Sequence, residues 1–393
     1  MKTRLLVMLA AAILGSARAS EAAAQSSDTI RYAISFPNAS RHEAEVVVTY
    51  TGLPSSPLEL RMSRSSPGRY ALHEFAKNVY NVRAENGSGR VMEVMRPNPH
   101  QWNVVGHDGT VRVSYTLFGD HAAGTYAAID LTHAHLNMPA TFMWARDTGD
   151  RPIAITLDIP DGSGWRIATQ LKPTAVASRF VAPHLQYFMD SPTEMSAFEM
   201  REWQPEGSSQ TVRIAIHHQG TSGQLDEYAA HARRIVEEQA AVFGELPDFD
   251  FGTYTFIADY LPWVRGDGME HRNSTILTNS GSLENMMGLL GTVAHEFFHA
   301  WNVERIRPAS LEPFNFEAAN MSGELWFAEG FTSYYGPLSL RRASIHDDAS
   351  YALSLTGAIN TVVNSPGRAF FSPVEMSMQA PFVDAATSVD AQN

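Results

Sequence analysis

The amino-acid sequence predicts an α+β fold in which a strand-rich amino-terminal part precedes a mixed part dominated by helices. Two observations support this class. From about residue 28 to 220, short segments alternate apolar and polar residues and are separated by Gly, Pro, Asp and Asn, as in antiparallel strands. Beyond that point, apolar residues recur at helical spacing. The 393 residues suffice for two or three domains, and we place a domain boundary near Gly220 to Gly223.

The first 24 residues have the pattern of an export signal. Lys2 and Arg4 precede the apolar run LLVMLAAAIL, and small residues at 17–19 (ARA) or 22–24 (AAA) offer cleavage sites. The apolar run is too short for a comfortable membrane span. The chain contains no cysteine, which excludes a lipid anchor on cysteine and any disulfide. We therefore expect a signal peptide at residues 1–24 and a periplasmic or secreted protein without further membrane contact.

Residues 25–220 are expected to form an antiparallel β-sandwich-like domain. Its strands are indicated by the segments EAEVVVTYTG, TVRVSYTLFG, PIAITLDIP and TVRIAIHHQG. The formal net charge of −13 argues against nucleic acid as a partner. His133 and His135 alternate as on a strand, and His217 and His218 end another. With no matching carboxylate or cysteine, we expect structural or exposed roles for these histidines.

Residues 221–393 are expected to form the second domain. The segment QLDEYAAHARRIVEEQAAVFG carries the apolar stripe of an amphipathic helix, whereas FGTYTFIADYL and STILT indicate strands. From Ser282 onward helices dominate. We expect Ser282 to cap a helix that runs through Asn302.

Within that helix, the segment His295-Glu296-Phe297-Phe298-His299 has the spacing of a metal site. Residues four apart project from one face, so His295 and His299 can bind the same ion. Glu296 lies beside them, where it can take a proton from metal-bound water without being a ligand. A hydrolytic zinc site also needs a third protein ligand and an open fourth position.

The third ligand is sought among the downstream glutamates Glu304, Glu312, Glu317, Glu324 and Glu329. Glu304 is too close in sequence to return to the same helix face, and Glu312 and Glu317 lie in a loop-like segment. Glu324 and Glu329 point to different faces of the next helix. Glu329 lies among large apolar residues, where an unpaired carboxylate would be costly to bury, and we choose it. Asn302 and Arg305 stand where a metzincin needs Gly and His, which excludes that class.

The segments HEFFHAWN, RIRP and LWFAEGFTSYYG together closely resemble the glycyl aminopeptidase family of gluzincin zinc peptidases. More distantly they resemble the aminopeptidase N and leukotriene A4 hydrolase group. SPGRYALHEFAKNV and DSPTEMSAF extend the likeness to the β domain. The resemblance implies a thermolysin-like catalytic domain, usually followed by a PDZ domain. It also implies one Zn²⁺ ion held by His295, His299 and Glu329, with Glu296 as the general base.

The segment Gly268-Met269-Glu270-His271 resembles the GxMEN segment of the aminopeptidase group, with His where Asn is usual. The resemblance implies that Gly268 and Met269 line the substrate and that Glu270 binds its free α-ammonium. A carboxylate can hold such a group by a charge-assisted hydrogen bond. We therefore expect an aminopeptidase that acts on peptide or protein N-termini. A preference for small N-terminal residues such as Gly is implied by the family.

The resemblance further implies an oxyanion-stabilising tyrosine well downstream of the third ligand. The tail FFSPVEMSMQAPFVDAATSVDAQN resembles the approach to it, so we expect that tyrosine beyond Asn393. On this view the catalytic domain is truncated, without its helical remainder or a PDZ domain. Tyr351 is a further candidate with no supporting motif. Two alternatives stay open: a zinc- and peptide-binding but catalytically impaired fragment, and a metalloendopeptidase, which Glu270 disfavours.

Overall fold

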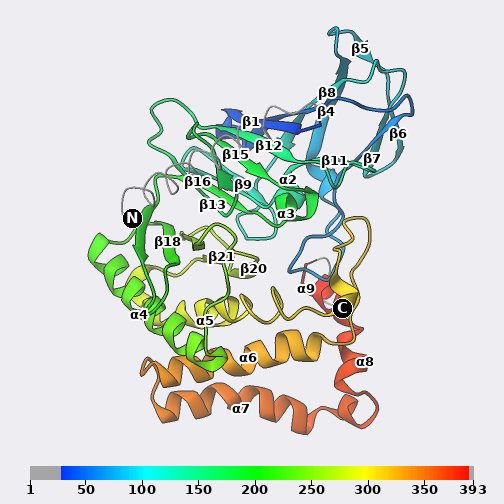
Figure 1. Cartoon of the computed structure of the whole chain (residues 1–393). Coiled ribbons are helices and arrows are strands. Elements are labelled where there is room, and N and C mark those ends of the chain that lie inside the picture. The colour runs from blue at the N-terminus through cyan, green and yellow to red at the C-terminus, as the bar shows by residue number, and fades with distance from the viewer. Residues whose placement is uncertain (1–27, 389–393) are drawn as a thin grey trace, which may run out of the picture.

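The computed structural model describes residues 28–388 and confirms the α+β class (Figure 1). A strand-rich amino-terminal part lies on one side of a five-stranded mixed sheet, and helices lie on the other. The predicted signal peptide at residues 1–24 lies outside the described residues. Within residues 28–388, no helix has both the length and the apolar character needed to cross a membrane.

The amino-terminal part contains three sheets. The largest has the strand order β14-β15-β12-β1-β2-β8-β4-β5, and only its β1–β12 pair is parallel. Its strands are β1 (Ile30–Asn38), β2 (Glu43–Tyr50), β4 (Val79–Asn86), β5 (Val91–Met92), β8 (Val111–Phe118), β12 (Ile153–Asp158), β14 (Lys172–Pro173) and β15 (Arg179–Ala182). Two four-stranded sheets complete this part: β13 (Arg166–Thr169), β16 (Thr193–Ser196), β10 (His133–Leu136) and β9 (Ala127–Ile129) in one, and β11 (Trp144–Ala145), β3 (Leu58–Arg61), β7 (Gln101–Val104) and β6 (Val94–Asn98) in the other.

Alternation along the strands produces the core of this part. In β2 every second residue is buried, and Val46, Val48 and Tyr50 have no exposed surface. These side chains face one common apolar cluster, because successive residues of a strand point to opposite faces. Two short helices, α2 (Met138–Thr141) and α3 (Leu185–Met189), pack into the same cluster.

The five-stranded sheet has the order β17-β18-β19-β21-β20 and positions the site. Its strands are β17 (Glu199–Trp203), β18 (Thr211–His218), β19 (Thr253–Tyr260), β21 (Ser274–Asn279) and β20 (Asp267–His271). β18 and β19 are parallel, and α4 (Ser222–Phe243) provides the crossover that such a pair requires. The domain boundary near residue 220 stays a prediction. β17 and β18 precede it, yet they pair into this second sheet.

The two faces of the five-stranded sheet contact different partners. Ile214 and Ile216 of β18 face the helices, where they pack with Leu225 of α4 and with Val293 and Phe297 of α5 (Leu290–Phe298). The opposite face carries Ala215, Ile257, Met269 and Ile276, which pack against Ala168 and Phe198 of the strand-rich side. The sheet therefore separates the helices from the amino-terminal part.

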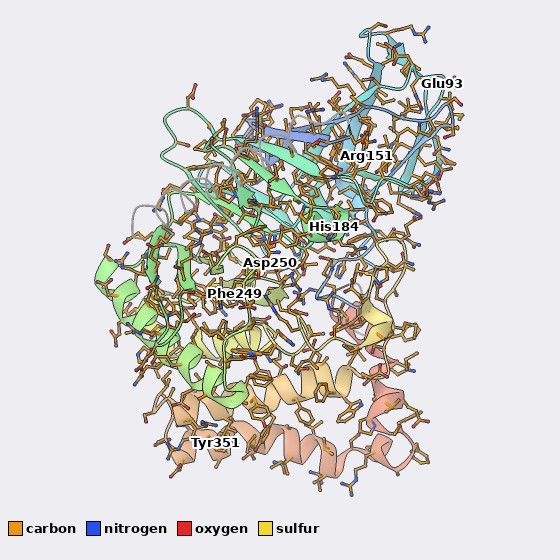
Figure 2. All side chains as sticks on the ribbon, in the orientation of Figure 1. Glu93, Arg151, His184, Phe249, Asp250 and Tyr351 are labelled. Carbon is orange, nitrogen blue, oxygen red and sulfur yellow. The ribbon has the colours of Figure 1, made fainter. Side chains whose placement is uncertain are left out.

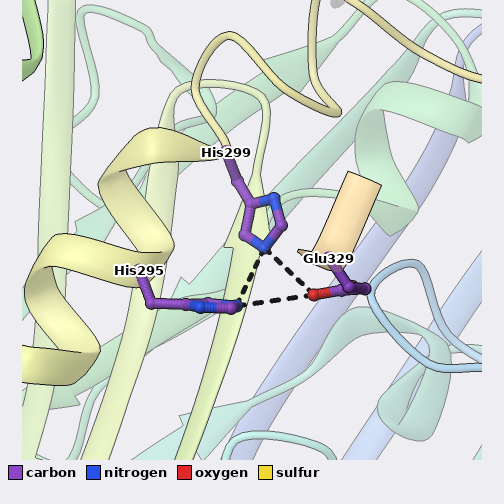
Figure 3. Close-up of side chains that lie close together, drawn as sticks. All are labelled: His295, His299 and Glu329. Atoms are coloured by element: carbon purple, nitrogen blue, oxygen red, sulfur yellow. Dashed lines mark hydrogen bonds and ion pairs between the residues drawn. The ribbon is translucent and has the colours of Figure 1, made fainter. Parts of the chain in front are cut away.

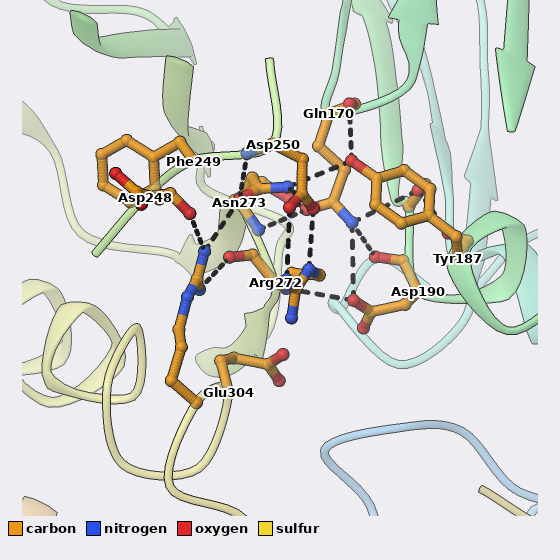
Figure 4. A network of polar contacts seen from close by, with 12 residues as sticks. Gln170, Tyr187, Asp190, Asp248, Phe249, Asp250, Arg272, Asn273 and Glu304 are labelled. Carbon is orange, nitrogen blue, oxygen red and sulfur yellow. Dashed lines mark hydrogen bonds and ion pairs between the residues drawn. The ribbon is translucent and has the colours of Figure 1, made fainter. Parts of the chain in front are cut away.

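A polar network fixes the amino-terminal part to the turn between β20 and β21 (Figure 4). The Gln170 carboxamide oxygen accepts bonds from the Asn273 amide and the Ser274 hydroxyl, each at 2.8 Å. Asp190 accepts from His271 Nδ1 at 2.8 Å and from the Arg272 amide at 3.0 Å. These contacts hold β20, and hence the residues beside the metal motif, against the strand-rich part.

The prediction of one long helix beginning at Ser282 is wrong. The Ser282 side chain makes no capping bond, and residues Leu283–Gly288 form the 3-10 helix η3. Asn285 has φ −109° and ψ 37°, which lies outside the helical region and breaks the run. The α-helix α5 begins at Leu290 and still carries the metal motif at its carboxyl end.

The remaining helices follow α5 in layers. α6 (Leu325–Arg342) packs on α5, and α7 (Asp348–Asn364) lies beyond α6 (Figure 1). The short helix α8 (Pro373–Ser377) leads back to α9 (Ala380–Ser388), which lies beside the amino-terminal part. No residue of α7 is buried.

Candidate metal centre and active site

Three side chains from two helices converge on one point (Figure 3). His295 and His299 come from the end of α5, and Glu329 comes from α6. The two Nε2 atoms are 3.2 Å apart, and Glu329 Oε2 is 3.4 Å from His295 Nε2 and 3.6 Å from His299 Nε2. A tetrahedral ion with bonds of about 2.1 Å has ligand separations of about 3.4 Å. The three atoms are therefore spaced as zinc ligands are.

The orientation of His299 is fixed by a second contact. Its Nδ1 atom lies 2.6 Å from the Asn302 carbonyl oxygen and donates to it. The proton is then on Nδ1, which leaves the Nε2 lone pair for a metal. The Asn302 side chain in turn donates to the carbonyls of Phe327 and Ala328, at 3.2 and 3.1 Å. One residue thus orients a histidine and joins the end of α5 to α6.

Glu329 is oriented by a tyrosine from the amino-terminal part. The Tyr70 hydroxyl donates to Glu329 Oε1 at 2.6 Å, which leaves Oε2 facing the histidines. Burial, together with the charge of Glu329, raises the pKa of Tyr70 well above its usual value, so the hydroxyl keeps its proton. Sequence reasoning missed this residue, although Tyr70 lies in the segment SPGRYALHEFAKNV that carried the family resemblance.

The charge of the centre fits a cation. Burial alone would lower the pKa of His299, but the carboxylates of Glu270, Glu329 and Glu296 raise it to about 10. Burial likewise opposes ionisation of Glu329, yet its bonds to both histidines hold its pKa well below the usual value. Carboxylates crowded around two imidazoles form an electronegative site. A divalent ion suits this donor set.

Glu296 is buried between the metal centre and β20. Burial raises its pKa to about 7, with the neighbouring histidines opposing. Its Oε2 atom has no hydrogen-bond partner within residues 28–388. A Cβ atom placed on Gly268 would lie 2.2 Å from Glu296 Oε1 and 2.7 Å from Thr292 Cγ2. Gly268 is therefore the residue that lets β20 approach the carboxylate.

Glu270 completes the group on the same side. One oxygen of Glu270 lies with one oxygen of Glu296 and one nitrogen of His299 in a cluster whose members are within 4.8 Å of one another. All three residues are buried. Met269, in contrast, points into the apolar layer behind β20 with no exposed surface. Side chains of successive strand residues alternate, so Met269 supports β20 while Glu270 faces the centre.

Three consecutive residues of the amino-terminal part reach the site. Gly68 has φ +77°, and an added Cβ would lie 2.6 Å from Met269 Cγ and 3.0 Å from Glu270 Oε2. Arg69 forms a short ion pair with Asp267 and donates to the Gly268 carbonyl at 3.2 Å. Tyr70 follows with its bond to Glu329. The two parts of the chain therefore build the centre together.

These residues surround a cavity of about 330 Å³. Its lining comes from the loop at residues 68–70, from β20, from the metal helices and from α9: Gly68, Arg69, Tyr70, Gly268, Glu270, His295, Glu296, His299, Glu329, Ala380, Val383 and Asp384. Asp384 accepts from the backbone amides of Tyr70 and Ala71 at 3.1 and 2.8 Å. A larger cavity of about 1150 Å³ contains Asp190, Asp250 and Arg272 but none of the predicted site residues.

Tyr351, the candidate considered from the sequence, and two tyrosines of α6 lie away from the metal centre. Tyr351 is on the outer helix α7, beyond α6 from the metal centre (Figure 2). Tyr334 is 48% exposed, and the Tyr335 ring stacks on Phe298 with centroids 4.9 Å apart. None of the three lines the cavity of the metal centre.

Solved structures share this fold. An aminopeptidase N family protein from Idiomarina loihiensis superposes with a TM-score of 0.80 at 24% identity, over 90% of this chain and 61% of its own. An M1 zinc metallopeptidase mutant from Deinococcus radiodurans gives a TM-score of 0.50 at 13% identity, over 91% of this chain and 79% of its own. The chain thus spans 61% of the length of the Idiomarina protein.

Two family profiles match the sequence. The Peptidase M61 N-terminal domain matches residues 31–197, and M61 glycyl aminopeptidase matches residues 288–393. A comparison with curated protein sequences gives no match. The two profiles belong to one family and together cover most of the chain. The first matches the strand-rich part, and the second matches the region that contains the metal motif. The chain therefore belongs to the M61 glycyl aminopeptidase family.

Proposed function

We propose that this protein is a zinc-dependent aminopeptidase that removes small N-terminal residues, Gly foremost, from peptides. The observation that carries the proposal is the convergence of Glu270 and Glu296 with the three metal-ligand side chains on one cavity of about 330 Å³. An aminopeptidase needs this combination: a metal centre, a proton acceptor and an anion for the free amino group. The preference for Gly is suggested by the description of the family.

His295, His299 and Glu329 would hold the ion. When bound, zinc supplies a Lewis acid that polarises the substrate carbonyl and lowers the pKa of water. Glu296 accepts the proton of the attacking water and returns it to the leaving amine. Its Oε2 atom has no hydrogen-bond partner within residues 28–388, so it is available to a water molecule.

Glu270 would bind the α-ammonium of the substrate. Its carboxylate lies in the same buried cluster as Glu296, so an amino group bound there stands one residue from the scissile carbonyl. An internal peptide segment has no α-ammonium to offer at that position. This placement favours an aminopeptidase over an endopeptidase.

Hydrolysis of glycyl p-nitroanilide by the zinc-loaded protein tests the proposal. We expect Glu296→Gln to lower kcat by at least about 100-fold, because general acid–base catalysis contributes that much, and to keep its zinc. Glu227→Gln, on the exposed surface of α4, is the matched control and should leave turnover unchanged. Turnover unaffected by Glu296→Gln would contradict the assigned role. Zinc binding without turnover in the parent protein would favour a binding protein instead.

A second comparison separates the two peptidase classes. We expect Glu270→Gln to raise KM for glycyl-alanyl peptides and to leave the rate on their N-acetylated counterparts low and unchanged. Cleavage of the acetylated peptides by the parent protein would identify an endopeptidase.

We also propose export, which sequencing of the mature amino terminus from a cell envelope fraction would test.

A further inference from the structure

A second group of metal-binding side chains lies where the amino-terminal part meets the five-stranded sheet. His135 of β10 and Glu194 of β16 are paired across those strands. His217 of β18 and Asp259 of β19 are paired in the same way. Each strand pair thus supplies one imidazole and one carboxylate. None of the four lines the cavity of the metal centre.

Three of these side chains, His135, Glu194 and Asp259, each offer one ligand atom within 4.8 Å of the others, and His217 lies beside the two carboxylates. His135 Nδ1 is 3.7 Å from Glu194 Oε2 and 3.9 Å from Asp259 Oδ2. His217 Nδ1 is 3.5 Å from Asp259 Oδ1 and 4.0 Å from Glu194 Oε1. The corresponding separations in the His295, His299 and Glu329 centre are 3.2 to 3.6 Å. Both groups are therefore spaced as ligands around a shared ion.

Five buried polar atoms of this group lack a hydrogen-bond partner among residues 28–388. His135 Nδ1, both oxygens of Glu194, His217 Nδ1 and Asp259 Oδ1 are buried and make no hydrogen bond to any residue in the part of the chain that the structure describes. The Glu194 side chain is 0% exposed and that of Asp259 is 4% exposed. Buried carboxylates are costly unless they are paired or coordinate a metal.

Direct ion pairing does not account for the spacing. A charge-assisted hydrogen bond between imidazolium and carboxylate contracts to about 2.7–2.9 Å. His271 and Asp190 show this in the same protein, with Nδ1 2.8 Å from Oδ1. His135 and His217 stand 3.5 to 4.0 Å from both carboxylates instead. Each histidine thus lies near both acids without a short bond to either, which points to a centre between them.

The tautomer of His135 agrees with coordination. Its Nε2 atom lies 3.3 Å from the Gly124 carbonyl oxygen and donates to it, and Nδ1 faces the carboxylates. A backbone carbonyl on the other ring nitrogen is the usual support of a metal-bound histidine. His133 packs edge-on against the His217 ring, with centroids 5.1 Å apart, and closes one side of the group.

We propose that His135, Glu194, His217 and Asp259 bind a second zinc ion, which joins the amino-terminal part to the five-stranded sheet. Two neutral imidazoles and two carboxylates neutralise a divalent ion and provide the N and O ligands that zinc accepts. Four protein ligands leave no open position, so this ion is structural. Sequence reasoning found no matching carboxylate for these histidines, because Glu194 and Asp259 lie on other strands.

Counting zinc in four forms of the full chain tests the site. After equilibration with zinc and gel filtration, elemental analysis should give two ions per parent chain and one for Glu329→Gln. Asp259→Asn should also give one, and the double variant none. Asp158→Asn, an exposed aspartate at the end of β12, is the control and should keep two. Glu329→Gln, which keeps only the second site, should gain a few °C in Tm when zinc is added.

The outcomes separate this site from the proposed enzyme. One ion in the parent chain and none in Glu329→Gln would overturn the second site and leave the first intact. Where Asp259→Asn does not fold, anomalous scattering from parent crystals at the zinc edge decides: a peak among the four side chains supports the site, and its absence overturns it. An anomalous peak that appears only at the X-ray absorption edge of another metal would show that the occupant is not zinc.

Discussion

Gly268 shows how one missing side chain shapes the site. We expect Gly268→Ala to lower kcat/KM on glycyl p-nitroanilide by at least about 100-fold, because its Cβ would stand 2.2 Å from Glu296 Oε1 and displace it. Gly357→Ala in α7 is the matched control, since an added Cβ there meets nothing within 4 Å. Full activity of Gly268→Ala would show that β20 can move away without consequence.

Tyr70 orients Glu329 and would act on a bound metal ion through it. Tyr70→Phe removes one hydrogen bond and keeps the ring, so we expect zinc affinity to fall by about 10- to 100-fold, as for other residues that orient a ligand. Competition with a chelator measures this affinity. Tyr80→Phe, on the 51% exposed Tyr80, should bind zinc as the parent does. Equal affinity in both variants would mean that α6 alone orients Glu329.

At the scale of residues, the sequence predicts contacts within a motif and misses contacts between distant segments. His295 and His299 come together because residues four apart lie on the same face of a helix. Glu329 was predicted as a ligand because an unpaired carboxylate among apolar residues would be costly to bury. Tyr70 lies 259 positions before the glutamate that it contacts. No periodicity links two such segments. The sequence does not predict that Glu194 and Asp259 lie beside His135 and His217, for the same reason.

Among the elements, the end of α5 and the start of α6 are joined by hydrogen bonds from the Asn302 side chain, which we call the Asn302 clamp. We expect Asn302→Ala to lower the free energy of unfolding by about 1–3 kcal/mol, because it removes the hydrogen bonds that the Asn302 side chain donates to the carbonyls of Phe327 and Ala328 in α6. Urea denaturation of the zinc-free protein measures this change apart from metal binding. Asn364→Ala, at the exposed end of α7, should cost less than about 0.5 kcal/mol. A loss of the same size in both variants would exclude the clamp.

The spacing of apolar residues predicts secondary structure best in segments where one period continues over many residues. The apolar stripe predicts α4, which the structure begins with a capping box at Thr221, and alternation predicts β2. The segment after Ser282 has the apolar content of a helix, but Asn285 leaves the helical region and η3 results. Local composition does not distinguish a 3-10 turn from the first turn of an α-helix. The start of the metal helix was therefore missed, whereas its motif was not.

For the molecule as a whole, the outer helix presents an apolar surface. Leu353, Ile359, Val362 and Val363 of α7 are 56% to 73% exposed. Because apolar patches of this kind associate in water, we expect the chain to self-associate as its concentration rises. The double variant Ile359→Glu/Val362→Glu should remain monomeric at concentrations where the parent does not. Sedimentation velocity measures this, with Asn360→Glu as the control for added charge. A monomeric parent at every concentration would refute the expectation.

The loop Gly68-Arg69-Tyr70 has a consequence for how such enzymes can diverge. It touches Glu270, Asp267 and Glu329, and so the strand-rich part holds pieces of the catalytic apparatus itself. A gene fusion that exchanged this part for that of a distant relative would break the centre unless the loop and its three acidic partners travelled together. We therefore expect an exchange of one part to succeed only when substitutions at these positions are matched at their partners.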